Sequence, residues 1–309
     1  MQGSRTNPGI TVLAAVLASG MVATAGCKDR AAEIGTEDNP LVFVMTASTV
    51  RDKETSINDL HSVLEQESGL HIRMEIAPTP VRAIQLFGSD TVDAGLLAPF
   101  EFLLARKLHD VEPALQVLRE GPTYRGTILV RKDAGINTLE DLTGRRIAYT
   151  DPYSLSGFVL PAAHLSRIDV DVDSVFAGGH DEAVAMLEEG RVEAAATYER
   201  RAKGELDRRG LRELALWEPV ANEPVFFRSD LDEKVRGPIV RAFKAAPEDE
   251  RAAAALHDLL GADGFAQVDD ATYDELERLA MEAGLEVQSL VPGGWFVWHT
   301  STEPFVPIP

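Results

Sequence analysis

The sequence predicts an α/β fold divided into two lobes. From residue 41 onward, short apolar runs alternate with longer segments in which apolar residues recur at helical spacing, an order typical of α/β architecture with a largely parallel sheet. A single sheet that held every predicted strand of this 309-residue chain would be large for one domain, so we expect two lobes. No internal repeat or low-complexity segment interrupts the alternation.

The apolar runs predict the strands, and the segments of helical spacing between them predict the helices. The expected strands are 41–46, 71–76, 94–97, 126–131, 146–150, 174–177 and 194–197. The expected helices are 57–67, 81–87, 99–107, 156–167, 181–189 and 199–209, followed by 231–243, 248–260 and 272–283. Beyond residue 284, a proline-rich tail is expected to cover one lobe with Trp295 and Trp298.

The amino terminus predicts export. Arg5 precedes an apolar run at 10–22, and no acidic residue occurs before Asp29. This run is shorter than the ~20 apolar residues that span a bilayer. We therefore expect residues 1–26 to be a lipoprotein signal peptide and residues 27–39 to be a polar tether.

Cys27 is the only cysteine in the chain, so no internal disulfide can form. A lone cysteine in an exported chain indicates another use for the thiol. The small residues before it resemble the bacterial lipobox, in which Cys27 would be lipidated and become the mature N-terminus, although Thr24 stands where that motif usually has leucine. The alternative is cleavage after Ala25 by the ordinary signal peptidase, which would release a free periplasmic protein.

The charge balance argues against one class of partner. The chain has a net charge of −20, and removal of residues 1–26, whose one charged residue is Arg5, would move it to −21. A field of this sign disfavours nucleic acid. An anionic ligand would have to be held by local dipoles and not by an excess of positive charge.

The stretch Asp-Pro-Tyr-Ser-Leu-Ser-Gly-Phe at 151–158 joins a predicted strand to a predicted helix. The first turn of a helix has backbone N–H groups without internal partners and a partial positive charge, so it suits an anion. Serine is also a leading residue at ordinary helix N-caps. By itself the stretch is consistent with an anion site and with a simple cap at Ser154 or Ser156.

Short motifs occur in a fixed order from residue 92 to residue 273. They are Val-Asp-Ala-Gly-Leu-Leu-Ala-Pro-Phe-Glu-Phe (92–102), Thr-Tyr-Arg-Gly (123–126), Ile-Asn-Thr-Leu-Glu-Asp-Leu-Thr-Gly-Arg-Arg-Ile-Ala-Tyr (136–149), Ser-Leu-Ser-Gly-Phe-Val-Leu-Pro (154–161), Phe-Ala-Gly-Gly-His-Asp-Glu-Ala-Val (176–184), Gly-Arg-Val-Glu-Ala-Ala-Ala (190–196), Asn-Glu-Pro-Val (222–225) and Gly-Phe-Ala-Gln-Val-Asp-Asp-Ala-Thr-Tyr (264–273). In order and spacing they resemble the phosphate/phosphite/phosphonate-binding proteins of ABC transporters. The resemblance covers nearly the whole of the expected mature domain.

The resemblance implies a type II periplasmic-binding-protein fold, in which two crossover strands join two α/β lobes and a ligand cleft lies between them. Lobe 1 would comprise residues 40–125 and 224–309, and lobe 2 residues 126–223. This agrees with the rule that ligands of open α/β sheets bind beyond the carboxyl ends of the strands, and with hinge closure as the working motion. It also implies a monomer in the bacterial cell envelope, facing the periplasm or the cell exterior.

In this family the helix start at 154–157 receives the phosphonate oxygens, which assigns that role to Ser154, Ser156 and Gly157. Gly157 would let the oxyanion approach the backbone closely. Leu155 is a departure, because the family usually has a hydroxyl residue there.

Four further positions match family residues near the ligand. His180 would donate a hydrogen bond to the oxyanion, with an ordinary helix start as its alternative, and the Tyr124 hydroxyl would reach the cleft, with packing at the hinge as its alternative. Glu199 and Glu223 would accept hydrogen bonds from a protonated ligand oxygen or from an ammonium group. A shift of one residue would bring Tyr198 to the site instead of Glu199, and a solvated glutamate is the other alternative.

The first lobe would add the hydroxyl of Ser48, which follows the first strand. Pro80 lies where phosphonate binders often carry an aromatic residue, Ala98 replaces a common glycine and Phe102 a common tyrosine. These departures are compatible with the fold and with transport, but they leave the identity of the ligand open.

The leading hypothesis is a lipid-anchored solute-binding component of an ABC importer. It would capture phosphonate, phosphite or phosphate, meet the permease and ATPase subunits, and touch the bilayer through its N-terminal lipid only. The alternatives are a ligand-sensing lipoprotein that feeds a signalling partner and a receptor for a different small anion. A ferric-ion receptor using Tyr124, Tyr198 and His180 is a minor variant; otherwise neither a metal nor a cofactor is expected.

The sequence argues against an enzyme. It has no Gly-x-Ser-x-Gly elbow, no His-Glu-x-x-His, no Walker loop and no Gly-x-Gly-x-x-Gly fingerprint.

Overall fold

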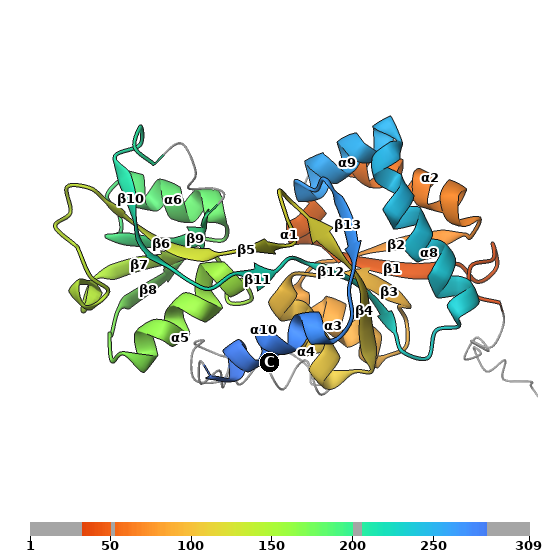
Figure 1. Cartoon of the computed structure of the whole chain (residues 1–309), viewed down its shortest axis with the longest axis horizontal. Helices are drawn as coiled ribbons and strands as arrows, with labels where there is room; N and C mark the ends of the chain where they lie inside the picture. Colours follow the sequence, from red (N-terminus) through yellow and green to blue (C-terminus); the bar gives the residue numbers. More distant parts are fainter. Residues whose placement is uncertain (1–32, 51–52, 200–205, 283–309) are drawn as a thin grey trace, which may run out of the picture. The chain divides into compact units, whose positions relative to one another are not determined.

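The computed structural model describes residues 33–50, 53–199 and 206–282 (Figure 1). The chain divides into two compact units, Met1–Glu33 and Ile34–Pro309, and every element given below belongs to the second. No helix among the described residues combines the length and the apolar character needed to cross a bilayer. The predicted signal peptide, Cys27 and the tail with Trp295 and Trp298 lie outside the described residues.

A six-stranded sheet has the order β13-β4-β12-β3-β1-β2. Its strands are β1 (Leu41–Thr46), β2 (Ile72–Ala77), β3 (Ala94–Leu96), β4 (Val111–Leu118), β12 (Pro224–Arg228) and β13 (Gly264–Gln267). β1 pairs in parallel with β2 and β3, whereas β12 and β13 pair antiparallel with their neighbours. All residues of β1 are buried, as expected for a central strand covered on both faces.

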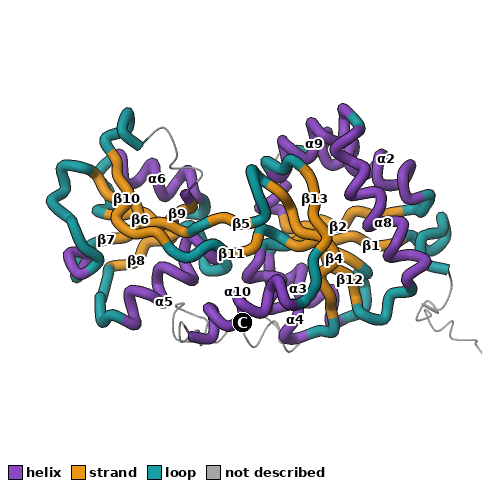
Figure 2. Tube along the Cα trace, in the orientation of Figure 1, coloured by secondary structure: helices purple, strands orange, loops and turns teal. Residues whose placement is uncertain are grey.

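Helices cover both faces of this sheet (Figure 2). They are α1 (Ala47–Val50), α2 (Glu54–Ser68), α3 (Pro80–Gly88), α4 (Pro99–Leu108), α8 (Glu233–Ala245), the 3-10 turn η3 (Ala246–Glu248), α9 (Glu250–Leu260) and α10 (Ala271–Glu282). Leu41, Phe43 and Met45 share a core with α2, α8 and α9. Val42 and Val44 share the other core with α3 and α4. Successive side chains of β1 therefore pack against the helices on opposite faces of the sheet.

A five-stranded sheet has the order β10-β6-β9-β7-β8. Its strands are β6 (Gly126–Arg131), β7 (Arg146–Tyr149), β8 (Asp173–Phe176), β9 (Ala194–Tyr198) and β10 (Leu211–Leu216). Its helical elements are η1 (Glu140–Leu142), the π-helical turn η2 (Leu155–Val159), α5 (Leu160–Arg167) and α6 (His180–Glu188). β7 is parallel to β8 and β9, whereas β6 is antiparallel to β9 and β10. Because η2 runs directly into α5, a single helical segment begins soon after β7.

Two short antiparallel strands connect the sheets. β5 (Thr123–Tyr124) leads into β6, and β11 (Val220–Ala221) leads into β12. Asn222 fixes this connection, because its Nδ2 donates to the carbonyl oxygens of Val117 (2.8 Å) and Gly121 (3.0 Å). The buried hydroxyl of Tyr273 on α10 donates to the carbonyl oxygen of Asn222 (2.8 Å). The connecting strands are thereby tied to β4 and to α10.

The predicted α/β class is confirmed, and every predicted strand has a counterpart within a few residues. The expectation of largely parallel sheets is wrong, because each sheet also contains antiparallel pairs. Most of those pairs involve β4, β10, β12 or β13, which are missing from the prediction, but β6 and β9, both predicted, also pair antiparallel. The predicted helix 199–209 is also corrected at its end, where 206–210 form turns; residues 200–205 lie outside the described residues.

Candidate functional site

A pocket of about 230 Å³ lies at the connection between the two sheets. It is lined by Ala98, Pro99, Arg119, Tyr124, Ser154, Leu155, Ser156, His180, Tyr198, Glu223 and Leu260. Several of these residues follow the carboxyl ends of parallel strands, which is where open α/β sheets bind ligands. The volume is below the ~300–1,000 Å³ of sites for drug-sized ligands, so the pocket suits a small solute.

The start of η2 contributes a helix N-terminus to this pocket. Ser154 is the N-cap, and its Oγ accepts a hydrogen bond from the N–H of Gly157 (3.0 Å). The N–H groups of Phe158 and Val159 both donate to the carbonyl oxygen of Ser154 (3.0 Å each), which widens the first turn to a π-turn. π-turns are frequent at functional sites. The N–H groups of Leu155 and Ser156 precede these donors, so they have no acceptor within the helix.

Ser156 and Ser154 have different local roles. The Ser154 oxygen already serves the cap, so the cap predicted from the sequence exists. Ser156 is only 3% exposed and lines the pocket. Its hydroxyl can therefore donate a hydrogen bond to an oxygen of a ligand in the pocket.

Gly157 lies beside the pocket and is not among the residues that line it. A Cβ atom at this position would collide with the side chain of Thr150 and come within 2.7 Å of Ser154 Oγ. The glycine therefore lets the helix start pack closely on the end of β7. Gly126 on β6 supports the same turn, because a Cβ there would meet Cα and Cβ of Ser156 at 3.3 Å.

His180, Tyr198 and Tyr124 line the pocket together. His180 begins α6, and its Nδ1 lies 3.0 Å from Oγ1 of the buried Thr197. The rings of His180 and Tyr198 meet edge to face with centroids 4.7 Å apart, and those of Tyr198 and Tyr124 at 6.4 Å. These contacts fix the orientation of three polar side chains on elements that follow β8, end β9 and form β5.

The start of α4 provides a third helix N-terminus through Ala98 and Pro99. Glu101, in the first turn of this helix, accepts a hydrogen bond from the N–H of Ala98 (3.1 Å). Burial, and to a smaller extent the charges of Asp151 and Glu223, raises the pKa of Glu101 to about 8, although the Ala98 hydrogen bond lowers it. Glu101 is therefore mostly neutral at pH 7 and adds little negative charge beside the pocket.

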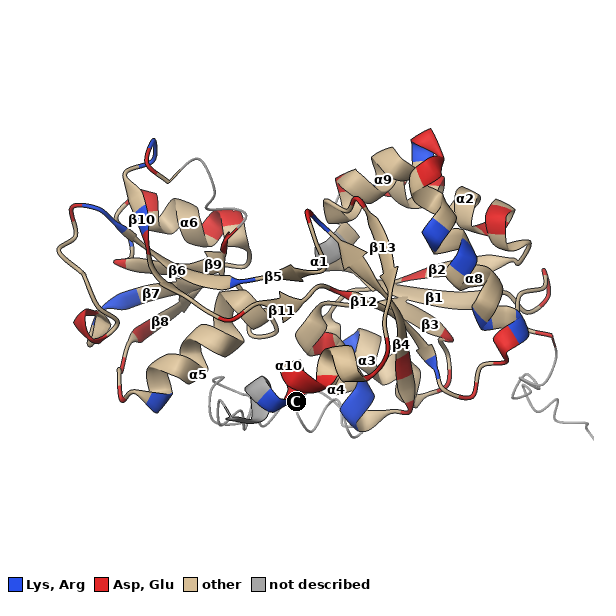
Figure 3. Cartoon of the chain, viewed as in Figure 1, with Lys and Arg blue, Asp and Glu red and all other residues tan. Residues whose placement is uncertain are grey.

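Arg119 is a pocket residue that the sequence analysis missed. It follows β4 and forms an ion pair with Glu223, and its Nε donates to the carbonyl oxygen of Leu260. Since β4 is absent from the predicted strands, nothing placed Arg119 at the carboxyl end of a strand. Figure 3 shows acidic and basic residues distributed over the helices, strands and loops of both sheets.

Besides Gly157, Glu199 and Ser48 are the predicted site residues that the described pocket lining does not include. Tyr198, and not Glu199, lines the pocket. Oε2 of Glu199 is buried without a hydrogen-bond partner among the described residues, and Glu213 is near enough that burial and the charge of Glu199 raise its pKa. Ser48 belongs to α1, but its side chain, like Cys27, lies outside the described residues.

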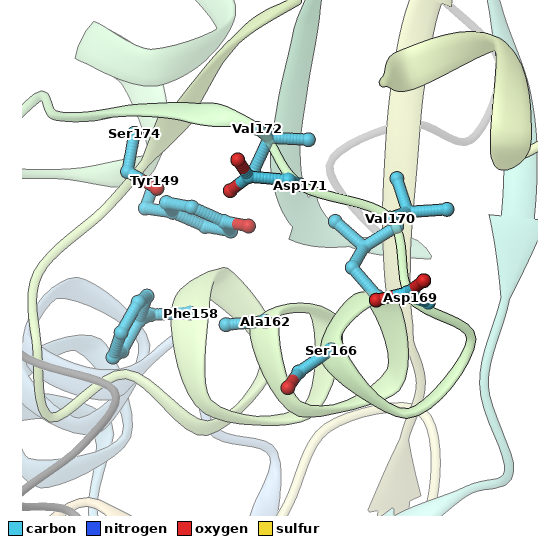
Figure 4. A pocket seen from close by; sticks show the side chains of 10 residues that line it. Tyr149, Phe158, Ala162, Ser166, Asp169, Val170, Asp171, Val172 and Ser174 are labelled. Carbon is cyan, nitrogen blue, oxygen red and sulfur yellow. The ribbon is translucent and has the colours of Figure 1, made fainter. Parts of the chain in front are cut away.

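Two other cavities differ from this pocket in character. One of about 470 Å³ lies between β7, β8 and α5; Figure 4 shows Tyr149 and Phe158 in it, with Asp171 across from Ser166 of α5. Another of about 540 Å³ shares Arg119, Tyr198 and Leu260 with the candidate site. Within the described residues, no group of three or more His, Cys, Asp or Glu side chains could hold a metal ion.

Comparison with protein families gives a match over most of the described chain. The model of the family described as "ABC transporter, phosphonate, periplasmic substrate-binding protein" matches residues 43–273, more than half of the chain. The phosphate-import protein PhnD of Mycolicibacterium smegmatis is 25% identical over 169 residues, which is 50% of this chain and 53% of the relative. The chain thus spans about half the length of this curated relative.

Solved structures share the fold at low sequence identity. PhnD1 from Prochlorococcus marinus, in complex with methylphosphonate, has a TM-score of 0.66 and 15% identity, and the match covers 79% of this chain and 98% of that one. A binding-protein component of a phosphonate ABC transporter from Pseudomonas aeruginosa has a TM-score of 0.63 and 17% identity, covering 85% and 98%. At these identities the likeness concerns the fold.

Proposed function

Because the chain belongs to the family of periplasmic substrate-binding proteins of phosphonate ABC transporters, we propose that it captures a small phosphorus oxyanion in the pocket at the connecting strands. Its fold is that of the type II periplasmic binding proteins, as the sequence predicts. Membership implies export to the cell envelope, a small anionic solute, and permease and ATPase partners. It also supports a role as a transport component over an enzymatic one.

The observation that carries the proposal is the meeting of three helix N-termini at one pocket. The starts of α4, η2 and α6 contribute Ala98, Ser156 and His180 to its lining. Each N-terminus has a partial positive charge and N–H groups without helical acceptors, which together favour an oxyanion. Phosphonate, phosphite and phosphate have the size and the acceptor oxygens that this arrangement suits.

The site also limits the negative charge around the ligand. Glu101 is mostly protonated near neutral pH, and Glu223 forms an ion pair with Arg119. An anion entering the pocket therefore meets few uncompensated carboxylates, although the whole chain has a net charge of −20. This supports local dipoles as the main attraction and adds Arg119, which the sequence analysis did not include.

We place the site between lobe 1 (40–125 and 224–309) and lobe 2 (126–223), which would close on the ligand as a monomer. Gly157 supports the site by packing, and Ser154, Ser156, Tyr124 and His180 contact the ligand. A sensor that passes occupancy to a signalling partner would share this geometry. Neighbouring genes for a permease and an ATPase, as opposed to a histidine kinase, would separate the two roles.

Calorimetry on the purified protein tests the proposal. The ligands are methylphosphonate, 2-aminoethylphosphonate, phosphite and phosphate. Sulfate tests the alternative of a receptor for a different small anion, and ferric citrate tests the alternative of a ferric-ion receptor. We expect saturable binding of at least one phosphorus oxyanion. Binding of sulfate or iron alone, or of none of the six, would reject the proposed ligand class.

Replacing Ser156 by alanine is expected to weaken binding of the preferred oxyanion by about 2 kcal/mol, or about 30-fold, because one charge-assisted hydrogen bond is lost. Titration calorimetry of both proteins measures the change. The matched control is Ser166→Ala on α5, a serine that lines the cavity of Figure 4 instead. Equal affinities of wild type and Ser156→Ala would reduce Ser156 to a packing residue.

We also propose that Cys27 carries the lipid that holds the protein at the membrane. The Cys27→Ser variant, expressed in a bacterial host, is then expected in the soluble envelope fraction, whereas the wild type sediments with membranes. Fractionation followed by immunoblotting measures the distribution. If the variant stays with the membranes, the anchor is something other than this cysteine.

A further inference from the structure

We infer that Arg119 and Glu223 form a charge-matched pair that selects phosphorus oxyanions without a cationic substituent. The inference rests on the proposed function, because it concerns the ligand of the same pocket. It departs from the sequence-based expectation that Glu223 would accept a hydrogen bond from a protonated oxygen or an ammonium group of the ligand. The structure gives the Glu223 carboxylate a different partner.

The pair is held inside the pocket wall by hydrogen bonds to the rest of the chain. The Arg119 side chain is 17% exposed and that of Glu223 is 23% exposed, and Nη1 of the arginine donates to Oε2 of the glutamate. A second donation, from Arg119 Nε to the Leu260 carbonyl oxygen, fixes the plane of the guanidinium. A partly buried pair of this kind is screened by salt less than a surface pair.

The backbone on both sides of the pair is also fixed. The Glu223 carbonyl oxygen accepts a hydrogen bond from the N–H of Val117 on β4 (2.9 Å), and the Arg119 N–H donates to the carbonyl oxygen of Gly121 (2.9 Å). Both residues therefore extend from adjoining strands, β4 and the start of β12, which pair antiparallel. The ion pair is part of the first sheet and its connection, not a chance contact of two long side chains.

The consequence concerns the charge that the ligand can carry. Among the described residues that line the pocket, Glu223 is the one carboxylate, and Arg119 compensates its charge. Within this pocket an ammonium group would meet Arg119 and three helix N-termini, where cations are disfavoured, and the one carboxylate there is already paired. Methylphosphonate, phosphite and phosphate fit this environment, whereas 2-aminoethylphosphonate does not.

Neutralising Glu223 and neutralising Arg119 should change the affinity for methylphosphonate in opposite directions. In Glu223→Gln the arginine loses its counterion, so binding of methylphosphonate is expected to tighten by about threefold or more. In Arg119→Gln the carboxylate is left facing the ligand, so methylphosphonate is expected to bind at least about tenfold more weakly, while 2-aminoethylphosphonate gains relative to it. The double variant, which has neither charge, should lie between the two.

Calorimetry with methylphosphonate and 2-aminoethylphosphonate on the wild type and the three variants decides the question, with circular dichroism to verify folding. The expected result is a wild-type preference for methylphosphonate and the opposed shifts just given. Equal weakening in both single variants, or a wild-type preference for 2-aminoethylphosphonate, would overturn the inference and leave the proposed function intact. A wild type that binds no phosphorus oxyanion would overturn both.

If Arg119→Gln does not fold, Glu223→Gln alone is decisive. Tighter methylphosphonate binding supports the pair as a charge selector, whereas unchanged or weaker binding rejects it. Repeating the wild-type titration at high salt adds a second readout, because an electrostatic preference between the two ligands should shrink with ionic strength.

Discussion

Raising the pH from 5 to 8 is expected to lower the free energy of unfolding of the wild type by about 3 kcal/mol more than that of Glu101→Gln. The Glu101 side chain is almost completely buried, with 4% of the residue exposed. Burial is the main reason why the pKa of Glu101 rises from 4.5 to about 8, and the charges of Asp151 and Glu223 add to it. The phenol of Tyr153 also lies near this group, since the charge of Glu101 helps burial to raise the pKa of Tyr153.

The direction of the change in unfolding free energy with pH follows from which state of the chain binds the proton. Below pH 4.5 the carboxyl group of Glu101 is protonated in both the folded and the unfolded chain, so it causes no pH dependence. Between pH 4.5 and about 8 the unfolded chain ionises while the folded chain retains its proton, so stability falls as pH rises. Glutamine keeps the oxygen that accepts the Ala98 N–H and removes the titration.

Urea unfolding at pH 5 and pH 8 measures this difference. The matched control is Glu67→Gln, which removes a glutamate from an exposed position on α2. If Glu101→Gln and the wild type lose the same stability over this range, Glu101 is ionised in the folded protein. In that case a negatively charged carboxylate would lie beside the pocket, and the account of the charge around the ligand given above would need revision.

Replacing Gly157 by alanine is expected to destabilise the fold by about 3 kcal/mol and to weaken oxyanion binding by more than about tenfold. The added methyl group would collide with Thr150 and approach Ser154 Oγ to 2.7 Å. The Thr150 side chain is fully buried, so it cannot swing into solvent. The helix start must move instead, and Ser156 moves with it.

Thermal unfolding and calorimetry check this prediction together. Gly237→Ala is the matched control, because this glycine lies within α8 and its new methyl group would meet only the ends of the Glu233 and Arg241 side chains at 3.2 and 3.4 Å. Alanine is favoured in helices, so this control should not lose stability. The double variant Thr150→Ala/Gly157→Ala should regain part of the loss. A fully stable Gly157→Ala that binds normally would show that the contact with β7 is not tight.

The parts of the fold that the sequence predicts well are those built from neighbours in the chain. β1 and β6 match their predicted bounds because each is a continuous apolar run. β4 is interrupted by Glu112, Pro113 and Gln116, so no such run marks it. It is stabilised by pairing with β12 and β13, which come more than a hundred residues later in the chain, and local patterns cannot indicate such partners.

The same reasoning explains the accuracy of the site prediction. The helix start at Ser154 and Ser156 has a local signature, and in the structure Ser154 is the cap and Ser156 lines the pocket. Successive side chains of a strand point to opposite faces, so at the end of β9 a shift of one residue separates Tyr198, which lines the pocket, from Glu199, which does not. Arg119 has no local signature, because its place depends on β4.

Tyr124 and Glu223 belong to the segments that join the two sheets, yet both line the pocket. A solute in the pocket would therefore contact the connecting segments as well as the two proposed lobes. If the two proposed lobes close on the solute, a bulky substituent next to the connecting strands would sterically limit how far they close. The surface offered to the proposed permease would then depend on the shape of the solute as well as on its presence.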